Sequence, residues 1–302
     1  MNMAIHPKEK VERAYTKARS AHRYLAWTGA IFTVPTIIYF AWWIIIPMFY
    51  GLGLSFTNAS LLAPPQFIGL QNYLSSFHDP VFIDTVVRTV VYVIEVTIPT
   101  LALSLALAWL INRVVRARAL YLTLFFLPFV IPAVASSVIF ELILQPYGIF
   151  NQFLHIQVGW LANPRYAMIG LSIVTIWNLV GYYVVIFLAG LQQVPHELLE
   201  AAHIDGASGF QSFWHVVMPL MRPTLLFASV TTIANVLTNF TQPYVMTHGG
   251  PGNSTTVMPL LIYREAFEYS KAGQASAMAV LLLIASLILT WVQFRLLSDR
   301  NK

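Results

Sequence analysis

Residues 27–54 read WTGAIFTVPTIIYFAWWIIIPMFYGLGL, an apolar stretch of 28 residues. It belongs to a longer region, between Arg23 and Asp79, that contains no Asp, Glu, Lys or Arg. About 20 helical residues are enough to cross the hydrocarbon core of a bilayer. Over the whole chain of 302 residues, 58% are hydrophobic and 10% are charged, against about 25% charged in a soluble domain. The sequence therefore predicts a membrane protein and argues against a soluble enzyme.

Five further apolar blocks with few charges follow, at about residues 86–111, 120–144, 167–191, 220–245 and 275–296. Lipid offers no hydrogen-bond partner to the backbone, so each block is expected to be helical. The short alternating segments typical of a transmembrane barrel are not seen in the sequence. The predicted fold class is an all-α membrane protein with six transmembrane helices. Six prolines in or near the blocks predict kinks, namely Pro35, Pro47, Pro99, Pro128, Pro132 and Pro243.

The basic residues predict the orientation, because Lys and Arg gather in cytoplasmic loops. If the N-terminus lies in the cytoplasm, 13 of the 17 basic residues lie inside, and the other four are Arg88, Arg165, Arg264 and Lys271. Both termini are therefore expected in the cytoplasm, and the net charge of +5 indicates orientation rather than binding to nucleic acid. Residues 1–23 are expected to form a cytoplasmic N-terminal helix, and residues 24–302 a single transmembrane domain.

The loop at residues 194–223, between the fourth and fifth blocks, is the most informative stretch. Pro195 is typical of the first turn of a helix, and Gly206 is typical of the residue after a helix end. A second short helix is expected over about residues 209–217, before Pro219. These features predict a helix–turn–helix on the cytoplasmic surface, and from spacing alone it could be a plain helical hairpin.

The same loop resembles the EAA loop of ABC-importer permeases. The matching positions are Glu200-Ala201-Ala202, Gly206, Val216 and Met218-Pro219, with Asp205, Ala207, Phe213 and Pro223 in the longer form of the pattern. Val216 and Met218 stand where the family usually has Ile and Leu. The outer-loop stretch Thr247-His248-Gly249-Gly250-Pro251 resembles the maltose-type (MalF-like) carbohydrate permeases, in a compact form without the large second outer loop.

This resemblance implies a type I ABC-importer (MetI-like) permease fold in a prokaryotic inner membrane. The chain would be a non-catalytic permease subunit that pairs with a second, different permease and works with two ATPase subunits and an extracytoplasmic solute-binding protein. Six residues of the loop would couple it to the ATPase, namely Glu200, Ala201, Ala202, Asp205, Gly206 and Ala207. The sequence has no G-x-x-x-x-G-K-S/T phosphate loop. ATP and Mg²⁺ would therefore be bound by the partner ATPase, and no cofactor or metal is expected in this chain.

Polar side chains inside the spans are candidates for substrate contact, because hydrocarbon makes them costly. The predicted pathway residues are Trp177, Asn178, Gly181 and Tyr182 in the fourth span and Thr232, Asn235, Asn239 and Tyr244 in the fifth. The predicted site residues of the outer loop are Gly249, Gly250 and Pro251. Asn235 and Asn239 are four residues apart and are expected on one helix face. Hydrogen bonding between spans is the alternative role for these amides.

The kind of substrate follows from what the spans lack. No Lys or Arg lies mid-span, while amides, hydroxyls and aromatic rings are present. This composition favours an uncharged di- or oligosaccharide over glycerol 3-phosphate. Glycerol 3-phosphate or another polyol remains the alternative substrate, and a self-contained secondary carrier remains the alternative class of protein. Glu95 is an acid deep in the second span, and it is either functional or a protonated or hydrogen-bonded structural residue.

Overall fold

A computed structural model describes residues 29, 31, 33–60, 64–112 and 117–297. The predicted helix over residues 1–23 lies outside the described residues. The chain divides into two compact units, Met1–Leu54 and Ser55–Lys302, and each is described by itself. In the first unit a helical segment over Thr33–Leu54 is long and apolar enough to cross a membrane. It contains the π-helical turn η1 (Ala41–Ile45) and α2 (Ile46–Leu54).

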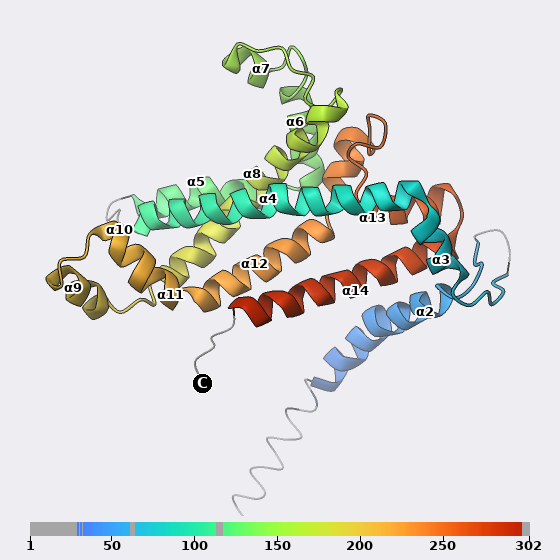
Figure 1. Cartoon of the computed structure of the whole chain (residues 1–302), viewed down its shortest axis with the longest axis horizontal. Coiled ribbons are helices and arrows are strands. Elements are labelled where there is room, and N and C mark those ends of the chain that lie inside the picture. The colour runs from blue at the N-terminus through green and yellow to red at the C-terminus, as the bar shows by residue number, and fades with distance from the viewer. Residues whose placement is uncertain (1–28, 30, 32, 61–63, 113–116, 298–302) are drawn as a thin grey trace, which may run out of the picture. The chain divides into compact units, whose positions relative to one another are not determined.

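The second unit is built from helices (Figure 1). In chain order they are α3 (Gln71–His78), α4 (Pro80–Asn112), α5 (Arg118–Val130), α6 (Ala133–Ile143), α7 (Ile149–Leu154), α8 (Pro164–Leu191), α9 (His196–Ile204), α10 (Gly209–Ser212), η2 (Phe213–Val217), α11 (Met218–Leu220), α12 (Arg222–Leu237), η3 (Pro243–Thr247), α13 (Met258–Tyr263), η4 (Arg264–Glu268) and α14 (Ala272–Leu297). The long helix α12 packs between α4 and α14. Helix α4 also packs along α8, so α4, α8, α12 and α14 form the body of this unit.

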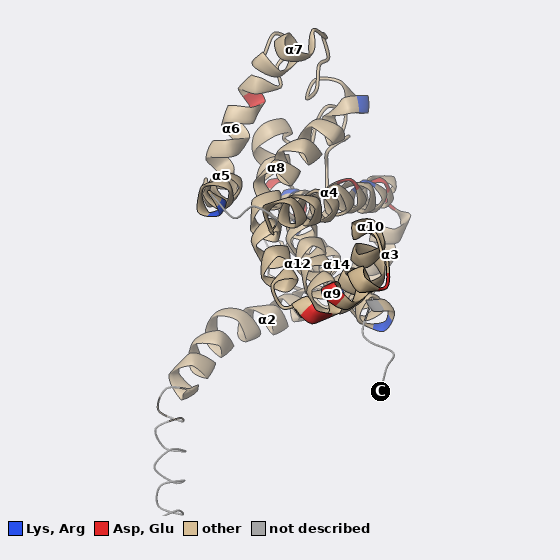
Figure 2. Ribbon diagram, turned by 90° about the vertical axis from the view of Figure 1, so that its left-hand side faces the viewer, with Lys and Arg blue, Asp and Glu red and all other residues tan. Residues whose placement is uncertain are grey.

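Four helices among the described residues are long and apolar enough to cross a membrane, and up to six spans result if each of two bent pairs counts as one. The four are Thr33–Leu54, Pro80–Asn112, Pro164–Leu191 and Ala272–Leu296. They coincide with the first, second, fourth and sixth predicted blocks, which confirms an all-helical membrane protein. Figure 2 shows that the long helices carry few charged residues, as a lipid environment requires.

The third predicted block is not one straight helix, so the expectation of a single helix there is wrong. Helices α5 and α6 meet at an angle of 95°. Pro132 stands four residues after Pro128 and has no N–H to donate to its carbonyl oxygen. The side-chain amide of Asn178 on α8 donates to that oxygen instead, at 3.0 Å. The kink predicted at Pro132 is thus confirmed, whereas Pro128 and Pro99 lie inside the helices α5 and α4.

The fifth predicted block is also interrupted. The segment Gly209–Leu220 meets α12 at 71°, and α12 ends at Leu237. Thr and Asn favour local side-chain hydrogen bonds over helix, and Pro243 has no N–H for the carbonyl of Asn239. Asn235 therefore lies on α12 and Asn239 beyond its end, so the expectation that both share one helix face is wrong.

Two loops of the second unit lie at opposite ends of α4. At its Asn112 end, Ile111 packs in one buried cluster with Leu191 and Val217. At its Pro80 end, Arg88 donates to the carbonyl of Asn253 at 2.7 Å. The predicted cytoplasmic loop 194–223 and the predicted outer loop around residue 253 thus lie at opposite ends of the helical body.

Candidate functional site

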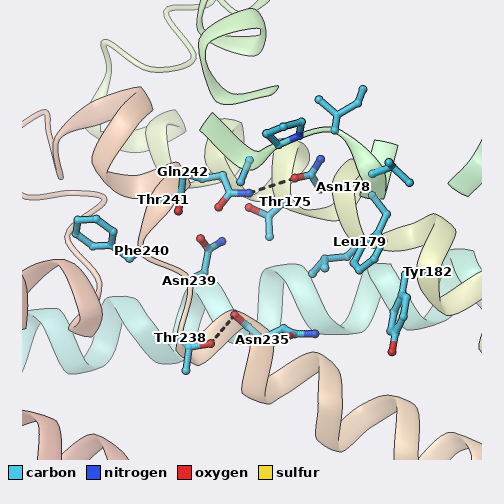
Figure 3. Close-up of a pocket in the computed structure, with 15 residues that line it drawn as sticks. Thr175, Asn178, Leu179, Tyr182, Asn235, Thr238, Asn239, Phe240, Thr241 and Gln242 are labelled. Atoms are coloured by element: carbon cyan, nitrogen blue, oxygen red, sulfur yellow. Dashed lines mark hydrogen bonds between the residues drawn. The ribbon is translucent and has the colours of Figure 1, made fainter. Parts of the chain in front are cut away.

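A cavity of about 590 Å³ lies where the α5–α6 bend, α8 and the end of α12 come together (Figure 3). Its lining comes from residues 129–133 at the bend, from Thr175, Asn178, Leu179 and Tyr182 on α8, and from Asn235 and residues 238–242. The volume is typical of a site for a small organic molecule. The cavity lies at two breaks in the helices, the bend at Pro132 and the end of α12 at Leu237.

Four of the eight predicted pathway residues of the spans line this cavity, namely Asn178, Tyr182, Asn235 and Asn239. The other four, Trp177, Gly181, Thr232 and Tyr244, lie outside the lining. The structure adds Thr175, Thr241 and Gln242, which were not among the predicted residues. Thr175 stands three residues before Asn178 on a helix, so the 3.6-residue period could have pointed to it.

The four residues outside the lining have other surroundings. The aromatic ring of Trp177 lies 4.8 Å from that of Phe140, and Thr232 is buried and donates to its own helix. Tyr244 stacks on Phe240, a lining residue, with ring centroids 4.9 Å apart. Gly181 lies directly under the backbone of α5, so it permits the close approach of α5 and α8.

Hydrogen bonds hold the cavity wall together across helices. Gln242 donates to the side-chain oxygen of Asn178 at 3.3 Å, and Figure 3 shows these two amides facing each other. Asn235 donates to the Tyr183 hydroxyl at 3.1 Å, and Asn239 to the Tyr92 hydroxyl at 2.7 Å. Hydrogen bonding between spans, the alternative role for these amides, is therefore present, and both amides line the cavity as well.

The lining carries amides, hydroxyls and aromatic rings and no charged side chain. The rings of Phe129 and Tyr182 stack with centroids 4.7 Å apart and an interplanar angle of 21°. Such a surface can hydrogen-bond and stack on a neutral polar molecule. In the part of the chain that the structure describes, no group of three or more His, Asp or Glu side chains could hold a metal ion.

The loop that resembles the EAA loop forms two short helices, as predicted. Pro195 directly precedes α9 rather than opening its first turn, and Gly206 follows the helix with a φ of +82°. The second helix begins at a capping box between Ser208 and Gln211. Of the six predicted coupling residues, those exposed are Glu200, Ala201, Asp205 and Gly206, and those half-buried are Ala202 and Ala207.

The inner side of this loop is anchored in the helical body. Leu199 of α9 and Phe213 of η2 pack against a buried cluster that contains Ile111 of α4 and Leu191 of α8. The Trp109 and Phe213 rings lie 4.7 Å apart. A displacement of α9 would therefore be transmitted directly to the ends of α4 and α8.

The predicted outer-loop residues lie in a tightly bonded turn. Gly249 has a φ of +74° and Gly250–Pro251 is a cis peptide bond. The guanidinium of Arg264 donates to the carbonyl of His248, and the Thr256 hydroxyl donates to the carbonyl of Gly249 at 3.1 Å. Gly250 and Pro251 also line a second cavity of about 510 Å³, beside the end of α6.

Glu95 lies on α4 and is half-buried against α8. Its carboxylate accepts a hydrogen bond from the Ser172 hydroxyl at 3.0 Å. This contact agrees with the hydrogen-bonded structural role, one of the two roles considered for Glu95.

Residues 73–301 match the sequence family described as "Binding-protein-dependent transport system inner membrane component". The chain belongs to this family. The permease is 34% identical to the probable ABC transporter permease protein YurN of Bacillus subtilis (strain 168), over 88% of this chain and 94% of the relative. It is 31% identical to the probable starch degradation products transport system permease protein AmyD of Thermoanaerobacterium thermosulfurigenes, over 90% of this chain and 94% of the relative.

The fold of the permease is also found in a solved structure. A bacterial ABC transporter involved in the import of the acidic polysaccharide alginate contains a chain that superposes with a TM-score of 0.79. The two chains are 22% identical, and the likeness covers 96% of this chain and 100% of the other. This likeness shows a shared fold.

Family membership confirms that the chain is a permease subunit of a binding-protein-dependent ABC transporter. It also confirms the predicted place, a multi-pass protein of the inner membrane, and the non-catalytic role. The resemblance drawn from the EAA loop and the outer loop was therefore correct. The individual coupling and pathway residues stay predictions.

Proposed function

We propose that the permease forms half of the transmembrane pathway for a neutral di- or oligosaccharide. The observation that carries this proposal is the uncharged lining of the cavity beside α8. A sugar offers hydroxyls for hydrogen bonds and apolar ring faces for stacking, whereas a phosphate buried there would lack a cation. The name of the Thermoanaerobacterium relative, a transport system permease for starch degradation products, supports maltose and its oligomers as the first sugars to test.

The proposed topology is that of a type I importer with six spans and both termini in the cytoplasm, in which α5 with α6 forms the third span and α12 with the residues that follow it forms the fifth. Two observations support it. Thirteen of the 17 basic residues fall on the side assigned to the cytoplasm. The loop 194–223 and the loop around residue 253 lie at opposite ends of α4, as alternating sides of a membrane require.

The proposed coupling element is α9 with the turn that follows it, docked on the partner ATPase. Glu200, Ala201 and Gly206 are exposed, while Leu199 packs inward against the cluster shared by α4 and α8. Closure of two ATPase subunits around ATP and Mg²⁺ would move this packed element as a unit and rearrange the spans. A second, different permease and membrane lipid would cover the exposed apolar side chains of α4, such as Ile94 and Leu103.

The substrate class is tested by uptake into proteoliposomes that contain the complete transporter, supplied with its own binding protein outside and ATP inside. Radiolabelled maltose, maltotriose and glycerol 3-phosphate are compared. ATP-dependent uptake of a neutral sugar is expected. Uptake of glycerol 3-phosphate without uptake of either sugar would contradict the proposal.

Replacing both lining amides, Asn235→Leu with Asn239→Leu, is expected to lower sugar uptake about 30-fold, because two hydrogen bonds of about 1 kcal/mol each are lost from the cavity. The variant should still co-purify with the ATPase. Uptake and ATPase content are measured on the same membranes. Asn112→Leu is the control, since this exposed amide at the end of α4 does not line the cavity. Failure of the double variant to assemble would show instead that these amides act mainly as bonds between helices.

A further inference from the structure

A fully buried tyrosine stands directly behind the cavity wall. Tyr92 on α4 is 0% exposed and is not a lining residue, yet both of its hydrogen-bond partners, Thr175 and Asn239, line the cavity. Its hydroxyl lies 2.7 Å from the Thr175 hydroxyl and 2.7 Å from the side-chain nitrogen of Asn239. The hydroxyl therefore joins α4, α8 and the segment after α12 at one point.

The direction of each bond follows from the number of protons. The Thr175 hydroxyl lies 3.1 Å from the carbonyl oxygen of Leu171, and a carbonyl can only accept. The single proton of Thr175 is used in that bond, so Thr175 accepts from Tyr92. The single proton of Tyr92 is then used as well, and Tyr92 can only accept from Asn239. This chain of hydrogen bonds, from Asn239 through Tyr92 to Thr175, requires the NH₂ group of Asn239, not its oxygen, to face Tyr92.

This chain of hydrogen bonds leaves the side-chain oxygen Oδ1 of Asn239 available on the cavity side. Within the described part of the chain, no side chain or backbone group donates to this oxygen. Asn239 is half-buried, and Figure 3 shows its amide between Gln242 and Asn235. An amide free to turn would offer a donor or an acceptor with similar ease, whereas this amide offers its oxygen as an acceptor.

We propose that Tyr92 is a positioning residue that orients the Asn239 amide, so that the cavity demands a hydroxyl donor of the substrate at this point. The inference rests on the proposed transport of a neutral sugar and adds a rule of specificity to it. A sugar with a hydroxyl at this position satisfies Oδ1. A derivative with fluorine there has no proton to donate and leaves Oδ1 unpaired, which is costly in a buried site.

The test compares maltose with maltose derivatives in which one hydroxyl at a time is replaced by fluorine. Uptake is measured with the complete transporter in proteoliposomes, for the wild type, Tyr92→Phe, Asn239→Ala and the double variant. The binding protein has its own preferences, but they are the same in every reaction. They cancel when the ratio of maltose to derivative uptake is compared between variants.

For one fluorinated position, the ratio of maltose uptake to derivative uptake is expected to be about fivefold higher in the wild type than in Asn239→Ala. A factor of this size is typical of one neutral hydrogen bond. Tyr92→Phe should lose the same discrimination, although Asn239 is still present, and the double variant should equal Asn239→Ala alone. Tyr73→Phe is the matched control, because it removes a tyrosine hydrogen bond to Ser55 outside the cavity. It should discriminate as the wild type does.

Wild-type discrimination at every position in Tyr92→Phe would overturn the positioning role, even if the total rate of uptake falls. Equal discrimination by the wild type and Asn239→Ala would overturn it as well, because Oδ1 would then accept no sugar hydroxyl. Failure of the proposed function gives a different result, namely wild-type transporter that takes up glycerol 3-phosphate and no neutral sugar.

Discussion

Gly206→Glu is expected to lower uptake by about 100-fold or more, while the protein still reaches the membrane in normal amount. Gly206 has a φ of +82°, and a Cβ at this position would meet no atom of the chain within 4 Å. The fold of the permease itself therefore loses only the cost of a left-handed backbone, about 1–2 kcal/mol. The main effect falls on the partner, since a docked turn cannot accept added bulk and charge. Abundance by immunoblot, ATPase co-purification and uptake are measured together.

Gly69→Glu separates loss of docking from backbone strain. Gly69 also has a positive φ, +61°, and a Cβ added there would meet nothing within 4 Å, but it lies in the loop before α3. This control should keep most of the uptake, and Gly206→Ala should lie between the two Glu variants. Normal ATPase association and uptake in Gly206→Glu would show that α9 and its turn do not couple the permease to the ATPase.

Gly181→Ala is expected to prevent accumulation of folded permease. A Cβ at this position would overlap the carbonyl oxygen of Phe125 and would lie 2.9 Å from the Cα of Phe126. Both atoms belong to the backbone of α5, so no side chain can turn away, and α5 must separate from α8. Overpacking of this kind costs about 3 kcal/mol or more. The separation would also break the bond between Asn178 and the carbonyl of Pro128, which supports the bend beside the cavity.

Membrane abundance and the melting temperature of the purified transporter measure this effect. Gly170→Ala on the same helix is the control, because a Cβ there would meet its nearest atoms at 3.2 Å and needs only a small adjustment. If Gly181→Ala accumulates and melts as the wild type does, the close contact of α5 and α8 is not part of the native fold.

Local patterns were enough to predict the helices of the loop at residues 194–223. The Pro195 and Gly206 positions bracket α9, and the expected second helix over residues 209–217 corresponds to α10 and η2. Each of these helices is short, and its ends are set by capping, by proline and by a left-handed glycine within the loop itself. For that reason the loop could be predicted without knowledge of the remaining helices.

The cavity could be predicted only in part. Asn178 and Asn235 are recognisable as amides within apolar sequence. Trp177 and Gly181 lie close to Asn178 in the same sequence stretch, but they are outside the cavity lining. Which face of a lipid-embedded helix meets a cavity depends on the helix packed beside it, and apolar periodicity is weak when both lipid and protein neighbours are apolar. The hydropathy of such a helix therefore does not show which of its faces packs against the other helices.

Charge, hydropathy and local capping act over short distances, so the sequence alone was enough to predict the membrane environment, the helical class and the loop that marks the permease family. The packing of the helices was needed to show that the bend at Pro132 measures 95° and that Tyr92 orients the amide of Asn239. These features depend on partners far apart in the chain. The carbonyl freed at Pro128 is satisfied by Asn178, and the Tyr92 proton is directed by Thr175, only once α4, α5 and α8 are packed together.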